Sequence, residues 1–237
     1  MKISIIIPSY NEQNSITDII NKLNNVKFPS FVDEKEIIII DDCSEDNTWD
    51  IVQELKNANP NIIIHRHAQN MGKGAAVKSG LKYFTGDVFI VQDADLELSP
   101  DDIPRMIEAM IQLKVEFVNG SRYLAGISRP LASYKRYLAN RFFSFLVSAL
   151  IDVRLTDIAC GYKLVHRNII SKIDLKEKRF GFEAELILKA LRLKKNNVTE
   201  IPVQYYPRSE QDGKKLKNID AFKILKTIIK YGLLKRK

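Results

Sequence analysis

Runs of consecutive apolar residues alternate with amphipathic segments along the first part of this 237-residue chain. The apolar runs are short and rich in β-branched residues, which is typical of strands covered on both faces of a sheet. The apolar runs lie at 2–8, 35–41, 61–65 and 87–91, and the amphipathic segments lie at 16–26, 47–55 and 72–84. Ser15 is expected to cap the first of these helices. The alternation predicts an α/β fold, a single domain with a mostly parallel sheet flanked by helices.

A cluster of polar residues directly follows each of the four predicted strands. In a parallel sheet with right-handed crossovers, the carboxyl ends of the strands lie at one edge, where open α/β sheets bind their ligands. We therefore expect the four clusters to converge at this edge. They read PSYNE (8–12), DDCSED (41–46), HAQNMGKG (67–74) and QDADLE (92–97).

The fourth cluster carries three carboxylates spaced two residues apart, at Asp93, Asp95 and Glu97. Crowded carboxylates repel one another, and they need a cation or hydrogen-bond donors nearby. Ligands that are all oxygen atoms favour Mg²⁺ or Mn²⁺ over zinc, and magnesium completes its coordination with water and substrate phosphates. The pattern therefore predicts that the carboxylates hold a divalent metal and that the metal holds a diphosphate.

An Asp-x-Asp pattern alone is also typical of a turn that leads into a helix. Ser99 and Pro100 predict such a helix start, so we interpret Asp101 and Asp102 as helix-start residues without a catalytic part. The metal interpretation therefore depends on the coincidence of all four clusters in this order.

The chain has a net charge of +8 and a pI of about 9.3, which predicts acidic partners such as nucleotide phosphates or an anionic membrane surface. Aromatic and basic residues do not interleave as they do on a nucleic-acid platform, so nucleic acid is not an expected partner. With two distant cysteines and nothing that resembles a signal peptide, a reduced, cytoplasmic compartment is expected. The sequence leaves the oligomeric state open.

Two segments are candidates for contact with a membrane, although no apolar run of about 18 residues occurs. Residues 129–155 place basic residues before an apolar stretch, which fits either a helix lying in an anionic membrane surface or a helix of the core. Residues 216–237 read as a basic, amphipathic helix or tail. We expect peripheral attachment at the inner face of the membrane.

The motifs of the four clusters, taken in order, resemble those of family 2 glycosyltransferases with the GT-A fold, a Rossmann-like architecture. Later motifs resemble the branch of dolichyl- or polyprenyl-phosphate mannose and glucose synthases, and they are NGSRY (119–123), TDIACGYKLVHR (156–167), RFGFEAELILKA (179–190) and EIPVQYYPRS (200–209). The resemblance covers residues 2–215. It implies a glycosyltransferase domain at 1–215 that is followed by the basic tail at 216–237.

The resemblance implies a binding site for a nucleotide-diphosphate sugar at the sheet edge. Asp93 and Asp95 match the metal motif of the family, and Glu97 stands as a third ligand where close relatives carry Gln. Asp41 still belongs to its strand and is interpreted as structural. The residues implied to bind the donor are Pro8, Tyr10, Asn11, Glu12, Asp42, Asn70, Gly72, Lys73, Asp93 and Ala94.

Departure of a diphosphate needs positive charge, which a metal held by Asp95 and the guanidinium groups of Arg122 and Arg208 would supply. A hydroxyl acceptor would also need a general base, whereas a lipid phosphate is already ionised. Asp157 is the candidate base, or else it orients Arg122 or Lys163 by an ion pair, and both interpretations stay open. The residues expected at the acceptor are Arg129, Lys163 and Glu183.

These inferences predict an inverting, metal-dependent glycosyltransferase that passes a hexose from a UDP-glucose or GDP-mannose type of donor to a polyprenyl or dolichyl phosphate. One alternative within the enzyme class is a hydroxyl acceptor, such as a diacylglycerol or a cell-surface glycan. A nucleotidyltransferase also pairs an α/β fold with carboxylate-bound Mg²⁺, but PSYNE stands where its glycine- and basic-rich opening loop is expected. A basic module without enzymatic activity would need no carboxylates at the sheet edge.

Overall fold

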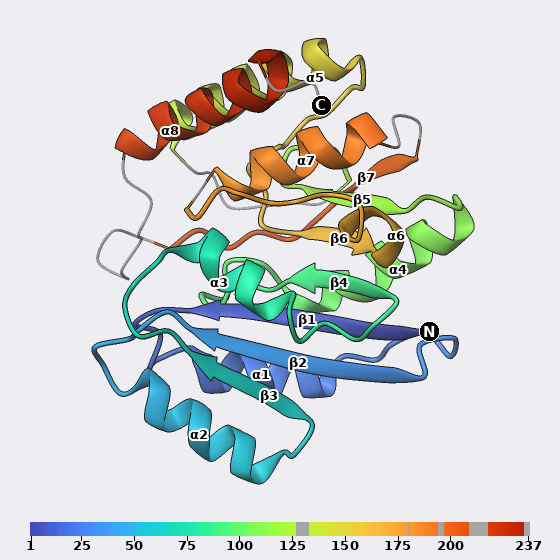
Figure 1. The fold of residues 1–237 in the computed structure, drawn as a ribbon. Coiled ribbons are helices and arrows are strands. Elements are labelled where there is room, and N and C mark those ends of the chain that lie inside the picture. Colours follow the sequence, from blue (N-terminus) through green and yellow to red (C-terminus); the bar gives the residue numbers. More distant parts are fainter. Residues whose placement is uncertain (127–132, 180, 194–196, 209–217, 235–237) are drawn as a thin grey trace.

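The computed structural model describes residues 1–126, 133–179, 181–193, 197–208 and 218–234. These residues form one sheet with the strand order β3-β2-β1-β4-β6-β5-β7 (Figure 1). The strands are β1 (Lys2–Ser9), β2 (Glu34–Asp41), β3 (Ile62–Arg66), β4 (Val88–Val91), β5 (Phe117–Ser121), β6 (Lys163–His166) and β7 (Val198–Pro202). Strands β1 to β4 run parallel to one another and β7 runs parallel to β5, whereas β6 is antiparallel to both β4 and β5. The predicted α/β domain with a mostly parallel sheet is confirmed.

Alternation along the strands divides the core into two apolar layers, one on each face of the sheet. In β1, Ile3, Ile5 and Ile7 point into one layer and Ile6 points into the other, and all four are fully buried. Because both faces are covered, the strand sequences read as continuous apolar runs.

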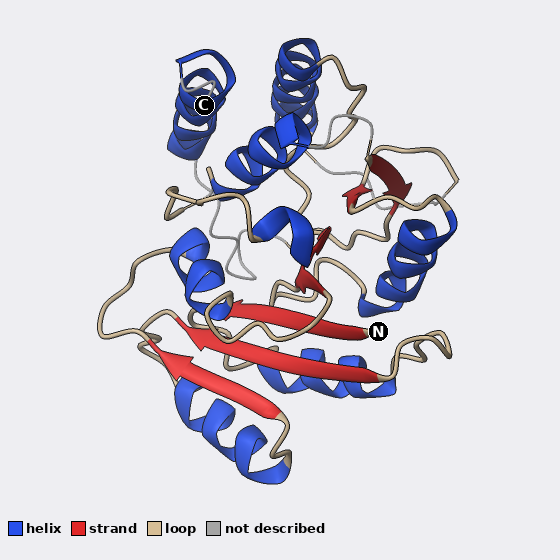
Figure 2. Cartoon of the chain, turned by 45° about the vertical axis from the view of Figure 1, so that its right-hand side comes forward, coloured by secondary structure: helices blue, strands red, loops and turns tan. Residues whose placement is uncertain are grey.

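Helices cover the two faces unequally (Figure 2). The layer around Ile3, Ile5 and Ile7 is closed by α1 (Ile16–Asn25), α2 (Thr48–Ala58) and α4 (Ile103–Gln112), with the short 3₁₀ helix η1 (Pro100–Asp102) before α4. The other layer is closed by α3 (Lys73–Gly80), α5 (Tyr134–Ile151), α6 (Arg167–Ile170), α7 (Phe182–Leu193), α8 (Asn218–Ile229) and the π-helical turn η2 (Lys230–Leu234). Figure 1 shows α5, α7 and α8 at the end of the molecule away from β3 and α2.

Three expectations about helix ends meet different outcomes. The third helix ends at Gly80 and not at 84, because the amides of Lys82 and Tyr83 bond three residues back in tight turns. Ser15 stands at the start of α1, but its hydroxyl donates to the Glu12 carboxylate at 2.7 Å and caps no helix amide. Ser99 does accept a hydrogen bond from the Asp101 amide at the start of η1, as predicted.

The candidate membrane segments combine buried and exposed apolar residues. In α5, Phe143 and Val147 belong to the core, whereas Phe142 and Phe145 are exposed. Helix α8 and the turn η2 pack against α5 and α7, so residues 218–234 of the predicted tail are docked on the domain. The predicted boundary at 215 lies outside the described residues. None of the helices in the described ranges is long and apolar enough to cross a membrane.

Candidate functional site

The four polar clusters meet at the carboxyl-terminal edge of the sheet, as the sequence predicts. Asn11 joins the first to the second, because its side-chain oxygen accepts from the Glu45 amide at 2.8 Å. Asp42 joins the second to the third through the amide of Gly72, at 2.6 Å. The ammonium group of Lys73 joins the third to the fourth, at 2.8 Å from a carboxylate oxygen of Asp93.

Asp42 is buried, and protein donors surround its carboxylate. One oxygen accepts from the Met71 amide at 2.9 Å and lies 2.7 Å from Nδ1 of His67, and the other accepts from Gly72. The side chain of Asn70 donates to the Asp42 backbone carbonyl at 3.3 Å. In this structure Asp42 and Asn70 therefore hold the turn before α3. Their contact with the donor stays a prediction. Asp41 is fully buried against Ser44 and Arg66, which confirms its structural part.

Gly72 is required where the turn enters α3. Its φ of +92° lies in the left-handed region, and a Cβ there would lie 2.7 Å from Cγ of Arg179 and 2.7 Å from the Lys178 carbonyl oxygen. The turn therefore carries Lys73 to the site with its backbone packed against the segment before α7.

The first cluster lines the same edge at the end of β1. Tyr10 donates from its hydroxyl to Glu45 at 3.4 Å, and Pro8 lies half-buried in the strand beside it. The carboxylate of Glu12 accepts from the guanidinium group of Arg208 at 2.9 Å. A segment almost two hundred positions later in the chain therefore closes on the predicted nucleotide pocket.

Asp93 and Lys73 form the centre of a three-member ion-pair group. The Lys73 ammonium lies 2.8 Å from Asp93 and 2.9 Å from Glu183 at the start of α7. Burial alone would lower the pKa of Lys73, but the two carboxylates raise it above its usual value. The structure thus places Glu183, expected at the acceptor, beside a predicted donor residue.

Asp93 has an ion pair with Lys73, whereas Asp95 has no ion pair within the described ranges. Burial, and then the charges of Asp93 and Glu97, raise the pKa of Asp95 to about 7. In the described part of the chain, the donor to its carboxylate is the Glu97 amide, at 3.1 Å. Ala94 between the two aspartates is buried. This is the carboxylate crowding that a cation relieves, so Asp93 and Asp95 fit the one or two ligands that Mg²⁺ usually takes from a protein.

Glu97 was predicted to be a third metal ligand, but in the structure its carboxylate binds Tyr205 and Arg208. Its two carboxylate oxygens accept from the Tyr205 hydroxyl at 3.1 Å and from the Arg208 amide at 2.9 Å. Within the described ranges, no group of three or more His, Cys, Asp or Glu side chains is placed to hold a metal. The three-carboxylate set is therefore not assembled here, because Glu97 holds the 205–208 segment against the site.

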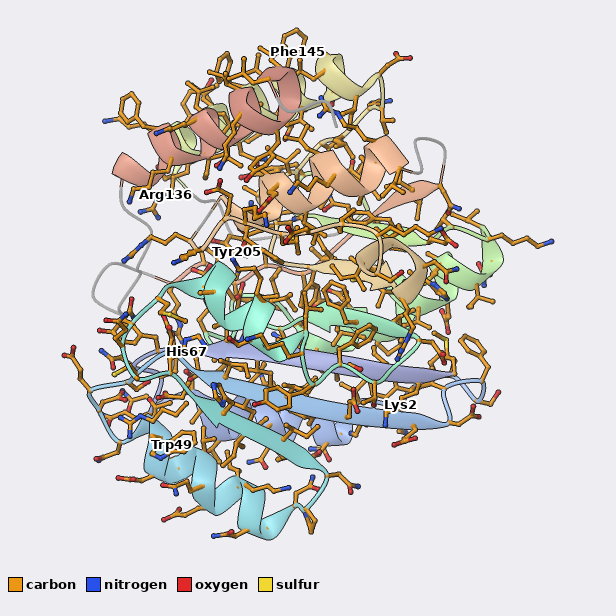
Figure 3. All side chains as sticks on the ribbon, in the orientation of Figure 1. Lys2, Trp49, His67, Arg136, Phe145 and Tyr205 are labelled. Atoms are coloured by element: carbon orange, nitrogen blue, oxygen red, sulfur yellow. The ribbon has the colours of Figure 1, made fainter. Side chains whose placement is uncertain are left out.

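Arg122 and Asp157 form a fork-to-fork ion pair beside this segment. The carboxylate of Asp157 is fully buried, and it accepts from Nε at 2.7 Å, from Nη2 at 2.8 Å and from the Arg122 amide at 3.0 Å. The guanidinium group also lies 5.1 Å from the centre of the Tyr205 ring, which Figure 3 labels between α3 and α7. Burial lowers the pKa of Arg122, but Asp157 raises it well above its usual value overall. Of the two interpretations of Asp157, the geometry favours orientation of Arg122.

Lys163 does not face the acceptor side of the edge. It is fully buried at the start of β6, and its ammonium donates to the backbone carbonyls of Ile158 and Cys160. Burial lowers its pKa. The expected acceptor contact is therefore corrected to a structural one: Lys163 shapes the 158–160 loop. Arg129 lies outside the described residues.

Three residues of the site were not predicted from the sequence, and they are His67, Tyr205 and Gly161. His67 bridges Asp42 to the Ser79 hydroxyl at 2.8 Å, and Tyr205 bridges Arg122 to Glu97. A Cβ at Gly161 would lie 2.5 Å from a carboxylate oxygen of Asp93, so the loop before β6 reaches the metal motif only through a glycine. The Cys-Gly pair and the repeated tyrosines before Arg208 were the available signals, but contact across the sheet edge is not readable from spacing.

Comparison with known proteins places the chain among glycosyltransferases. The model of glycosyl transferase family 2 matches residues 4–174. A dolichol-phosphate mannosyltransferase of Pyrococcus furiosus is 31% identical over 238 residues, which cover 99% of this chain and 64% of that protein. A UDP-N-acetylglucosamine–dolichyl-phosphate N-acetylglucosaminyltransferase of Methanococcus voltae is 31% identical over 85% of this chain and 84% of its own length. The chain thus spans less than two thirds of the Pyrococcus relative.

Solved structures share the fold. Glucosyl-3-phosphoglycerate synthase from Mycobacterium tuberculosis, in complex with Mn²⁺, UDP and glucosyl-3-phosphoglycerate, superposes with a TM-score of 0.71 at 17% identity. The match covers 98% of this chain and 80% of that one. At this identity the likeness concerns the fold.

Proposed function

Because the chain belongs to glycosyl transferase family 2, we propose that it transfers a hexose from a nucleotide sugar to a polyprenyl or dolichyl phosphate with inversion at the anomeric carbon. The names of the Pyrococcus and Methanococcus relatives support a dolichyl-phosphate type of acceptor. Those names carry two different sugars, mannose and N-acetylglucosamine, so the proposal includes donors of both the UDP-sugar and the GDP-mannose type.

The observation that carries this proposal is the placement of two arginines beside the Asp-x-Asp loop. Glu97 binds the amide of Arg208, and Tyr205 links Glu97 to the guanidinium group of Arg122. Arg122 is held by Asp157 in a bidentate ion pair that fixes its plane. Both guanidinium groups therefore lie at the edge where a donor diphosphate would lie between Asp93 and the first cluster, Arg208 being paired there with Glu12.

In the proposed reaction, an oxygen of the lipid phosphate attacks the anomeric carbon while the bond from that carbon to the diphosphate breaks. The electron pair of the broken bond stays on the diphosphate, and Arg122 and Arg208 would stabilise the charge that develops there. A divalent cation held by Asp93 and Asp95 would neutralise part of the same charge when bound. No proton has to be removed from the nucleophile, because a phosphate monoester is already ionised at neutral pH.

The environment of Asp157 supports a phosphate rather than a hydroxyl acceptor. A general base must reach the proton that it removes. Asp157 is fully buried, and both of its oxygens accept hydrogen bonds from Arg122. A carboxylate held in this way orients its arginine and has little freedom to act as a base.

We also propose that the enzyme works at the cytoplasmic face of a membrane, where its lipid acceptor resides. Exposed aromatic residues on α5, including Tyr134, Phe142 and Phe145, support a peripheral contact, and Figure 3 shows Phe145 at the outer end of the molecule. Replacing Phe142 and Phe145 by serine should weaken binding to anionic vesicles, whereas replacing the exposed Ile111 of α4 should not. Equal vesicle binding by all three proteins would leave these residues without a membrane role.

The proposal is tested by transfer itself. Thermal shift with UDP- and GDP-sugars plus Mn²⁺ identifies the donor, and the labelled sugar is then offered to a polyprenyl phosphate, the matching polyprenol and a diacylglycerol. We expect product only with the phosphate. Transfer to either hydroxyl lipid at an equal rate would overturn the acceptor, and the absence of any nucleotide-sugar effect would overturn the proposed function.

A further inference from the structure

A groove lined mainly by positive charge lies next to the donor edge, and we call it the basic groove. It has a volume of about 630 Å³ and lies between residues 69–71, residues 176–179 with Gly181, and helix α8 with the start of η2. Such a volume is within the usual range of small-molecule sites. Its charged lining residues are Lys176, Glu177, Lys178, Arg179, Lys223, Lys226 and Lys230.

The positive charge of the basic groove is only partly neutralised by protein carboxylates. Glu177 pairs with Lys230 at 2.7 Å, and Lys176 pairs with Asp174. In the described part of the chain, neither Lys178 nor Lys226 has an ion pair. Like charges in a concave site repel one another and focus the field, so the arrangement favours an anion.

The basic groove is separate from the proposed transfer site. Arg179 and the Lys178 carbonyl pack directly against Gly72, and that carbonyl accepts from the Ala75 amide at 2.9 Å. This contact forms a wall between the groove and the edge that carries Lys73. The residues placed at the transfer site, Asp93, Asp95, Arg122 and Arg208, do not line the groove.

The outer surface of α8 and η2 indicates what kind of anion the groove takes. Phe222 and Leu233 are exposed by 75% and 47%, and they lie on the same helical stretch as the groove lysines 223, 226 and 230. An inorganic phosphate has no apolar group that could contact exposed apolar side chains beside its site. A membrane lipid has both an anionic headgroup and apolar acyl chains, so it can contact both the lysines and the apolar side chains.

We propose that the basic groove binds the phosphate of an anionic membrane lipid, with the headgroup in the groove and the acyl chains against the apolar residues of α8. The binding does not depend on the transfer reaction, so loss of the proposed activity would leave it standing. It provides a second lipid contact besides the acceptor.

The first test removes the positive charge of the groove. The variant Lys178→Gln/Lys223→Gln/Lys226→Gln should bind vesicles of phosphatidylcholine with phosphatidylglycerol about 100-fold more weakly, since each basic residue at an anionic surface contributes roughly 1 kcal/mol. The matched control Lys22→Gln/Lys27→Gln/Lys82→Gln loses the same net charge from exposed positions elsewhere. Equal weakening in the two variants would mean attraction by net charge alone and would overturn the proposal.

The second test asks for a discrete site with a soluble probe. Monomeric dihexanoyl phosphatidylglycerol should bind the wild-type protein saturably in calorimetry, bind the control variant equally well and fail to bind the groove variant. Inorganic phosphate should compete weakly. Binding of inorganic phosphate as tight as that of the short lipid would overturn the assignment to a lipid, and a probe that binds the groove variant normally would overturn the site.

Discussion

Two aspartate loops at the same sheet edge differ in how their carboxylates are satisfied. After β2, Asp42 accepts from His67 and from the amides of Met71 and Gly72. After β4, Asp95 has the Glu97 amide and otherwise faces burial and other carboxylates, and its pKa is raised to about 7. In the first loop protein donors satisfy the carboxylate of Asp42, whereas in the second loop the negative charge of Asp95 is not balanced by an ion pair within the described residues.

The difference shows how a structural carboxylate is told from one available to a ligand. Hydrogen bonds to the charged form keep an acid ionised and anchored, so its loss harms the fold. A carboxylate without such donors destabilises the fold slightly and gains by binding a cation. The same substitution should therefore have opposite effects in the two loops.

The largest effect is expected on activity in the second loop. Asp95→Asn should lower the rate of sugar transfer or donor hydrolysis by about 1000-fold, because metal and electrostatic stabilisation of the leaving group is lost. Its melting temperature without metal should equal or exceed that of the wild type, since a repulsive charge is gone. Initial rates measure the first effect, thermal denaturation in EDTA measures the second, and calorimetric Mn²⁺ titration measures the loss of metal binding. Asp101→Asn, at the exposed start of η1, is the control, and undiminished rates in EDTA would contradict the metal assignment.

The largest effect on stability is expected in the first loop. Asp42→Asn keeps the shape but replaces one acceptor oxygen by a donor, so it leaves His67 or a backbone amide unpaired. We expect the free energy of unfolding to fall by about 2–4 kcal/mol in urea denaturation. Asp33→Asn, on an exposed side chain, should change it little. If Asp42→Asn were as stable as the wild type, the comparison between the two loops would fail.

Asp157→Asn sharpens the comparison, because Asp157 belongs with the satisfied carboxylates. Breaking its buried pair with Arg122 should lower the free energy of unfolding by about 3 kcal/mol. Since Asp157 orients rather than removes a proton, kcat should fall by less than the roughly 100-fold that marks the low end of general-base catalysis. A loss beyond 1000-fold with unchanged stability would instead identify Asp157 as a base.

The smallest effect is one of thiol reactivity. Burial, and then Asp157, raise the pKa of Cys160 to about 12, whereas Cys43 in the first loop is only half-buried. Because the thiolate is the reactive form, a thiol reagent at pH 8 should label Cys43 in the folded protein and Cys160 only after unfolding. Mass spectrometry of the labelled protein distinguishes the two. Rapid labelling of Cys160 would mean that the 158–160 loop opens in solution.

The sequence predicted the parallel part of the sheet and the meeting of the four clusters. Both follow from the alternation of apolar runs with amphipathic helical segments along the chain. It could not assign the partners of individual charges. Glu97 and Asp95 are two residues apart, yet one binds the 205–208 segment and the other faces Asp93. Lys163 was expected at the acceptor as a cation for the lipid phosphate, but its ammonium group is buried and donates to the backbone carbonyls of Ile158 and Cys160. Such outcomes depend on contacts between distant segments, which residue spacing does not encode.

The antiparallel strand β6 has a consequence for how the molecule folds. Strands β1, β2 and β3 are neighbours both in the chain and in the sheet, so each can pair soon after the previous strand forms. Strand β6 must instead insert between β4 and β5, pairing His166 with Val88 far back in the chain. Long-range closures of this kind are entropically slow. We therefore expect pulsed hydrogen exchange to protect β6 last, which would make ligand binding a late event that reports the completely folded chain.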